Sequence, residues 1–210
     1  MDIIRDIVKA RSMCCIVLDR GDRYWLRTAD LLDAGYTPGQ EISVEELEHF
    51  VLLHQYPRAL NEAVAMLARR PCSQGEIGQK LVSHHYMDET VEMVLYKLTR
   101  EHLLNDADFS EQWVRYRSGQ KFGKYRIFQE LRKKGISEED AKSALEQMDE
   151  DEILTHAKEL AAKALRSQKK ADDPKKQAQR IIQKLIRRGY TWETARDAFN
   201  MALQETEKNG

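Results

Sequence analysis

Cysteine, glycine and proline are scarce in this chain, and long apolar runs are absent. Three cysteines among 210 residues, none in a CxxC spacing, indicate neither a disulfide framework nor a zinc site. Ten glycines and four prolines, beside 41% hydrophobic and 33% charged residues, are typical of a folded, helix-rich chain. No run approaches the roughly 18 apolar residues of a membrane span, and Met1 to Ala10 carries charges where a signal peptide is apolar. We therefore expect a cytoplasmic protein that does not enter a membrane.

Motifs that carry common enzyme chemistry are also missing. The chain has no GxxxxGKS/T loop, no GxGxxG after a strand and no GxSxG elbow. The adjacent histidines His84 and His85 would point about 100° apart on a helix, so they do not form the i, i+4 pair of a metal site. We expect no catalytic residues, no metal and no cofactor. A hydrolase or nuclease remains as an alternative, tested by incubation with DNA and Mg²⁺.

The chain contains an internal repeat. Three segments align without gaps, beginning at Gln79, Gln129 and Gln183. Each has an isoleucine two residues before its start and a leucine two residues after it, such as Ile127 and Leu131. This i, i+4 spacing places both side chains on one helix face.

A turn and a second helix follow in each segment. Gly135 and Gly189 stand where a helix needs a left-handed C-terminal cap, and His85 takes this place in the first segment. Ser137, with Asp140 three residues later, has the form of an N-terminal cap for the next helix. One more amphipathic helix precedes each pair, at Ala59 to Arg69, Phe109 to Ser118 and Ile153 to Ser167. Each unit therefore has three helices and resembles a helix-turn-helix domain.

The third unit has an insertion between its first two helices. The charged stretch that includes Lys169 to Lys176 predicts an exposed turn. Asp173 and Pro174 suit the cap and the first residue of the helix that follows.

The N-terminal part of the chain has a different pattern. Met13 to Leu18 and Arg23 to Leu26 are rich in β-formers and predict a hairpin across the Asp-Arg-Gly-Asp turn between them. Thr28 to Ala34 predicts a helix stopped by Gly35.

A second helix is predicted in this part, and with it the limits of the domains. Ser43 and Glu46 predict a capped helix through about Leu53, ended by Pro57. We predict a mainly α fold in which three tandem three-helix repeats, at 57–105, 106–150 and 151–210, form an elongated curved array. A small α+β module with a hairpin precedes them at 1–56.

Charge is segregated along the chain although its net value is only -1. Eight basic residues oppose Glu130 alone between 115 and 134, eight acids oppose Lys142 between 137 and 152, and the chain turns basic again up to 188. Both signs would also be compatible with ordinary solvated helix faces. The candidate partner-binding residues are Arg115, Arg117, Lys121, Lys124, Arg126, Arg132, Lys133, Lys134, Arg187 and Arg188.

The second unit resembles the central repeat of RecX proteins. The resemblance rests on an acidic start, a Phe, a bulky residue, Val-Arg, a basic-Gly linker, Arg-Ile, Glu-Leu and Lys-Gly-Ile. Here these are Asp106, Phe109, Trp113, Val114, Arg115, Gly123, Arg126, Ile127, Glu130, Leu131, Lys134, Gly135 and Ile136. The likeness extends over about Pro57 to Gln204 and is weak at the N-terminus.

The resemblance implies binding rather than catalysis. RecX proteins lie along the groove of the RecA filament on DNA and modulate, mostly inhibit, recombinase and ATPase activity in DNA repair and recombination. It therefore implies a monomeric regulator whose partner is the RecA filament, with single- or double-stranded DNA as a further contact. The alternative is a direct DNA-binding protein, because tandem helix-turn-helix-like units and basic blocks also suit DNA. A gel shift without recombinase separates the two.

Overall fold

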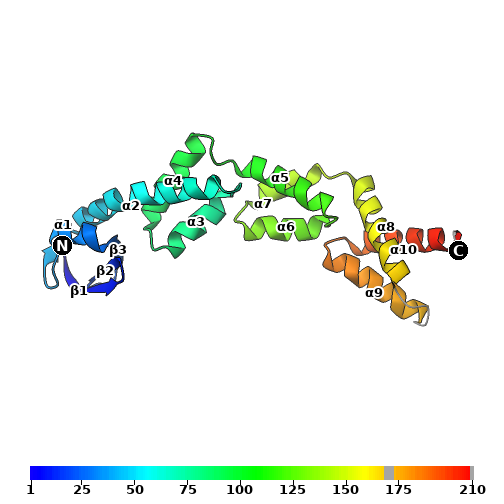
Figure 1. Ribbon diagram of the computed structural model, residues 1–210, viewed down its shortest axis with the longest axis horizontal. Coiled ribbons are helices and arrows are strands. Elements are labelled where there is room, and N and C mark those ends of the chain that lie inside the picture. Colours follow the sequence, from blue (N-terminus) through cyan, green and yellow to red (C-terminus); the bar gives the residue numbers. More distant parts are fainter. Residues whose placement is uncertain (168–172, 209–210) are drawn as a thin grey trace. The chain divides into compact units, whose positions relative to one another are not determined.

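The computed structural model describes residues 1–167 and 173–208. The chain divides into two compact units, Met1–Asn105 and Asp106–Gly210 (Figure 1). Unit 1 contains β1 (Asp2–Ala10), β2 (Met13–Leu18), β3 (Arg23–Arg27), α1 (Thr28–Ala34), β4 (Glu41–Ile42), α2 (Val44–Leu67), α3 (Gln74–Ser83) and α4 (Asp88–Arg100). Unit 2 contains α5 (Asp106–Gly119), α6 (Lys124–Lys133), α7 (Glu138–Glu146), α8 (Glu150–Ser167), α9 (Pro174–Arg187) and α10 (Trp192–Lys208). The predicted mainly α fold with a strand-containing N-terminal module is confirmed.

The strands of unit 1 form one antiparallel sheet in the order β3-β2-β1-β4. Strands β2 and β3 pair as the predicted hairpin, and Gly21 has a positive φ of 101° in its turn. Strand β1 was not predicted, because most of its side chains, such as Arg5 and Lys9, are exposed and give no alternation of apolar residues.

One face of this sheet builds the first core. Alternate residues of β2 and β3, such as Ile16 and Leu26, are fully buried against Leu47 and Val51 of α2. Helix α1 begins at Thr28, as predicted. It ends at Gly35, whose left-handed φ of 70° stops the helix, also as predicted.

Helix α2 runs through Pro57 without a break. Ser43 caps its first turn as predicted, because its hydroxyl accepts a hydrogen bond from the Glu46 amide at 3.4 Å. The prediction that Pro57 ends the helix is wrong. Buried residues continue at i, i+4 spacing on both sides of the proline, at Leu47, Val51, Gln55, Ala59 and Ala63. Burial of this whole stripe outweighs the ~3 kcal/mol that an interior proline costs a helix.

Helices α3 and α4 pack on the second half of α2. Ile77, Leu81 and Leu98 are fully buried against Ala59 and Ala63, and they form a second core in unit 1. The predicted domain boundary between residues 56 and 57 falls within α2, which contributes to both cores.

Unit 2 has two three-helix repeats around one continuous core. Buried side chains of α5 to α7, such as Ile127 and Leu131, belong to the same cluster as Ile181 and Leu185 of α9. Gly135 and Gly189, with φ values of 80° and 94°, take the predicted left-handed conformation after α6 and α9. His85 also has a positive φ, of 64°, although it carries a side chain. The repeated corner thus has one backbone geometry in all three places.

The predicted caps of α7 and α9 are confirmed. Ser137 accepts a hydrogen bond from the Asp140 amide at 3.0 Å, and Asp173 accepts one from Lys175 at 3.0 Å, with Pro174 at the start of α9. Most of the predicted exposed turn, at 168–172, lies outside the described residues. Among the residues that the structure describes, no helix has the length and apolar character needed to span a membrane.

Candidate protein-binding surface

The ten predicted partner-binding residues all lie in unit 2. Eight belong to α5, α6 and the turns that adjoin α6, and Arg187 and Arg188 lie at the C-terminal end of α9. The structure separates them into residues that bind other parts of unit 2 and residues that project into solvent.

The ring of Phe122 is contacted by the guanidinium groups of three of the predicted arginines. The guanidinium of Arg117 lies 4.0 Å from the centroid of this ring, that of Arg188 4.5 Å and that of Arg126 5.1 Å. These side chains come from α5, the turn after α9 and α6, so the ring joins the second repeat to the third. Stacking of guanidinium groups on an aromatic face is favourable, because the ring carries negative charge on its face. We call Arg117, Phe122, Arg126 and Arg188 the arginine cluster.

Glu130 balances part of the charge of this cluster. Its carboxylate accepts hydrogen bonds from Arg117 Nε at 2.6 Å and Nη2 at 2.5 Å, and from Arg126 Nε at 3.1 Å. Partial burial raises the pKa of Glu130, but the hydrogen bonds from Arg117 and Arg126 outweigh burial, so the pKa is lowered from its usual 4.5. The one acid in the basic block therefore fixes the arginines in place.

Arg188 and Tyr190 hold the turn that precedes α6. Arg188 donates to the carbonyl oxygens of Gln120 at 2.9 Å and Lys121 at 3.2 Å. The hydroxyl of Tyr190 donates to the same Lys121 oxygen at 2.9 Å. Burial, opposed by the nearby Arg188, raises the pKa of Tyr190 to about 12, so this hydroxyl keeps its proton and remains a donor at neutral pH.

Lysines of the predicted set also have partners within unit 2. Lys121 pairs with Glu159, and Lys124 Nζ lies 2.6 Å from Glu150 Oε1, both on α8. Lys134 Nζ lies 4.2 Å from the centroid of the Trp113 ring. Lys121, Lys124 and Lys134 are half-buried. Arg132 donates to the carbonyl oxygen of Ile136.

Three members of the predicted set project into solvent. Arg115 on α5, Lys133 on α6 and Arg187 on α9 are exposed. Within the described parts of the chain they form no ion pair. They are the members of the set whose charge is most available to a partner.

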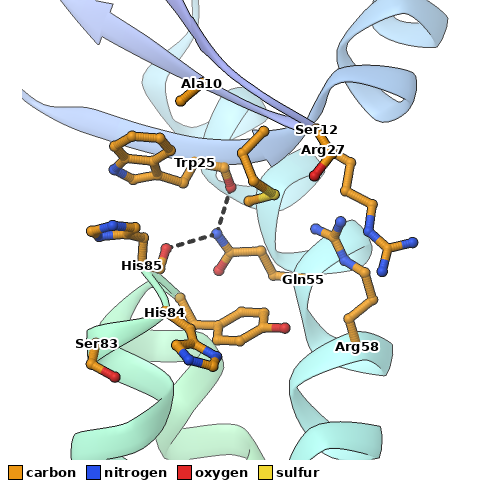
Figure 2. Close-up of a pocket in the computed structure, with 11 residues that line it drawn as sticks. Ala10, Ser12, Trp25, Arg27, Gln55, Arg58, Ser83, His84 and His85 are labelled. Atoms are coloured by element: carbon orange, nitrogen blue, oxygen red, sulfur yellow. Dashed lines mark hydrogen bonds between the residues drawn. The ribbon is translucent and has the colours of Figure 1, made fainter.

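Unit 1 holds a pocket that sequence reasoning missed. It has a volume of about 490 Å³ and lies between β3, α2 and the turn before α4 (Figure 2). Trp25 and His85 stack at one side of it, with ring centroids 4.5 Å apart and an interplanar angle of 16°. The left-handed residue of the first repeat thus uses its side chain to reach the sheet.

Gln55 lies at the centre of this pocket and connects its walls. Its amide nitrogen donates to the carbonyl oxygen of Trp25 at 2.7 Å, and its amide oxygen accepts from the Met87 amide at 2.8 Å and from the Thr90 hydroxyl at 3.1 Å. Only 1% of Gln55 is exposed, so these bonds satisfy a buried polar group. The signal in the sequence was a glutamine in the apolar stripe between Val51 and Ala59.

Comparison with known proteins places these helices in a family. The family model of the second three-helix domain of RecX matches residues 105–145, and that of the third matches 150–199. The regulatory protein RecX of Mycolicibacterium smegmatis is 34% identical over 152 residues, which cover 70% of this chain and 80% of the relative. The chain belongs to the RecX family. The regulatory protein RecX of Mycobacteroides abscessus is 37% identical over 149 residues, covering 70% of this RecX-family chain and 72% of the relative.

Solved structures of RecX proteins share the fold. A crystal structure of regulatory protein RecX matches with a TM-score of 0.63 at 24% identity, over 92% of this chain and 97% of that one. That of RecX from Lactobacillus salivarius matches with a TM-score of 0.62 at 24% identity, over 73% of this chain and 97% of that one. These structures share the fold, and the family models and relatives confirm the resemblance to the RecX family drawn from the second repeat.

Proposed function

We propose that this RecX-family protein is a non-catalytic cytoplasmic regulator that binds RecA-type filaments on DNA as a monomer and lowers their ATPase and strand-exchange activity. The observation that carries the proposal is the family membership, because relatives at 34% and 37% identity over most of their length bear the name of regulatory protein RecX. The exposed basic residues of unit 2 add a charged surface that a partner can contact.

The partner-binding set divides into two roles under this proposal. Arg115, Lys133 and Arg187 contact the partner, because they are exposed and their charges are not paired within the described residues. The arginine cluster fixes the second repeat against the third and so positions these three exposed residues for the partner. Attraction between such exposed charges is screened beyond ~10 Å at 0.1 M salt, so binding should weaken as salt rises.

The direct test measures recombinase activity. Purified protein is added to RecA assembled on single-stranded DNA, and ATP hydrolysis should fall as the protein is titrated in. The triple variant Arg115→Glu, Lys133→Glu, Arg187→Glu should need at least about tenfold more protein for the same inhibition, as expected for a loss of ~1.4 kcal/mol or more of binding free energy. Unchanged ATPase at equimolar wild-type protein would remove the proposal.

A matched control carries the same change of charge in unit 1. Arg23, Arg69 and Lys80 are also exposed and have no ion pair among the described residues. Their triple change to Glu should leave inhibition close to that of the wild type. If both triple variants lose inhibition equally, net charge rather than the unit 2 surface controls binding, and the assignment of contacts is wrong.

Direct DNA binding is the second candidate function, and two exposed tyrosines favour it. Tyr116 is 57% exposed and Tyr125 is 66% exposed, and both lie within the basic block, where exposed rings can stack on bases. A gel shift without recombinase tests this function. Tight, sequence-selective binding that is lost in Tyr116→Ala, Tyr125→Ala would favour it over filament regulation, whereas weak and non-selective binding would favour the filament.

A further inference from the structure

The pocket of unit 1 contains an arginine with an unused donor. Arg58 on α2 donates from Nε to the carbonyl oxygen of His54 at 2.9 Å, and its Nη1 lies 3.1 Å from Asp30 Oδ2. Its Nη2 is buried and has no hydrogen-bond partner among the residues that the structure describes. A buried donor on a charged group is costly to leave unpaired, so the site favours an added acceptor.

A second arginine adds positive charge beside this donor. Arg27, at the end of β3, is exposed, and its guanidinium forms no ion pair with any described residue. Figure 2 shows the guanidinium groups of Arg27 and Arg58 on the same side of the pocket. Asp30 is the carboxylate beside them, and it also lies 3.5 Å from His54 Nδ1. Asp30 pairs with Arg58, whereas the Arg27 guanidinium has no carboxylate partner among the described residues, so this side of the pocket carries a net positive charge.

Glu62 lies outside the lining but contacts two of its residues, because its carboxylate accepts a hydrogen bond from the Tyr86 hydroxyl at 3.4 Å and lies 2.6 Å from His84 Nδ1. None of the described residues that line the pocket is an aspartate or a glutamate. Burial, and then Glu62 outside the lining, raise the pKa of Tyr86, whereas Arg58 and Arg27 act against this rise. The carboxylate of Glu62 is thus engaged by Tyr86 and His84, whereas the carboxylate paired with Arg58 is that of Asp30.

We propose that this pocket binds a carboxylate of an acidic peptide segment from a protein partner, held between Arg27 and Arg58. Guanidinium groups match a carboxylate geometrically, because their paired N–H donors fit its two oxygens. The volume of about 490 Å³ exceeds the need of a bare ion and admits a side chain, which can lie against Met13 and Trp25. One face of Trp25 is covered by His85, which removes a stacking surface that a nucleic-acid strand would use.

The site lies in unit 1, apart from the basic residues of unit 2, and goes beyond the proposed filament regulation. Its test uses the full chain and no recombinase, so its failure and that of the proposed function are distinguishable. The chain has three tryptophans, and the indole N–H resonance of Trp25 is assigned from its loss in Trp25→Phe. The probes are a capped Gly-Glu-Glu-Gly peptide, the matched Gly-Gln-Gln-Gly peptide and inorganic phosphate.

The Glu peptide should shift the Trp25 resonance saturably, and the Gln peptide should leave it unchanged. Arg27→Gln should weaken this binding about tenfold or more, since one charge-assisted contact contributes that much to affinity. Arg58→Lys keeps a positive charge beside Asp30 but removes the forked donor, and it should also weaken binding. Arg23→Gln is the matched control, because Arg23 is exposed on the same strand outside the pocket, and it should bind as the wild type does.

Several results would overturn the assignment. No saturable shift with the Glu peptide would remove the site, and so would equal affinity in Arg27→Gln and the wild type. Binding of phosphate without binding of the Glu peptide would replace a protein carboxylate by a phosphate as ligand. Native amide spectra of each variant exclude loss of fold as the reason for lost binding.

Discussion

Gly123 and Gly189 lie backbone to backbone: a β-carbon added to Gly123 would be 2.3 Å from the carbonyl oxygen of Gly189. The Gly123 amide donates to the Arg188 carbonyl oxygen at 2.9 Å, and the Tyr125 amide donates to that of Gly189 at 3.1 Å. The turn after α9 thus packs directly against the first residues of α6. This contact joins the two repeats of unit 2 through main-chain atoms, which cannot give way as a flexible side chain can.

Gly123→Ala should lower the free energy of unfolding of unit 2 by about 2 to 3 kcal/mol, because the added methyl group forces the two backbones apart. Urea unfolding monitored by circular dichroism measures the change. Gly119→Ala is the control, since a β-carbon there meets nothing within 4 Å, and its effect should stay within about 0.5 kcal/mol. Equal stability of the two variants would contradict the close contact.

Phe122→Leu should destabilise the junction by about 1 to 2 kcal/mol. Leucine keeps an apolar side chain but removes the ring face on which Arg117, Arg126 and Arg188 stack. Tyr125→Leu removes a ring that is 66% exposed and should have little effect on thermal unfolding. If the Phe122 variant unfolds at the wild-type temperature, stacking of the arginines on this ring does not contribute to stability.

Glu130 should make the free energy of unfolding of unit 2 fall as the pH is lowered. Its pKa is lowered from 4.5 in the folded state, so the folded chain binds fewer protons than the unfolded chain. The stabilisation is present above pH ~4.5 and is lost as the pH falls through the folded-state value. Urea midpoints of the wild type should therefore drop more steeply on acidification than those of Glu130→Gln, which should already be less stable at pH 7.

The control for this titration is Glu139→Gln, an exposed position on α7. It should reproduce the acid dependence of the wild type. Parallel curves for the wild type and Glu130→Gln would show that the contacts of this carboxylate with Arg117 and Arg126 contribute nothing to stability.

Pro57→Ala should raise the free energy of unfolding of unit 1 by about 1 to 3 kcal/mol. Alanine restores an amide N–H inside α2, and the ring that crowds the preceding turn is removed. Pro71 lies outside the helices, so Pro71→Ala should give no such gain. A loss of stability in Pro57→Ala would mean that the proline favours the native helix by restricting the unfolded chain.

Structural features that depend only on residues close together in the chain could be predicted from the sequence. Gly135 and Gly189 indicated left-handed corners, and Ser137 and Asp173 indicated caps, because each depends on chemistry within about one helical turn. The path of α2 through Pro57 could not be predicted in this way. It depends on burial against strands and helices that lie far from the proline in sequence.

The candidate surface was predictable as charge but not as geometry. The cluster of basic residues is visible in the sequence, and all ten lie in unit 2. That Arg188 would contact Phe122 required the packing of two repeats, since these residues are far apart in the chain. For the pocket of unit 1, the sequence offered only Gln55 in the apolar stripe of α2. It could not place Arg27 beside Arg58, because the walls of the pocket come from a strand, a helix and a turn that are far apart in the chain.

Helix α2 has a thermodynamic consequence for the first half of the chain. It supplies Leu47 and Val51 to the core beneath the sheet, and Ala59 and Ala63 to the core of the first repeat. Each half of α2 alone is near or below the ~12–15 residues at which an isolated helix is marginal in water. Loss of one core would leave half of α2 without packing and would destabilise the other core. The hairpin module and the first repeat should therefore unfold in a single cooperative step.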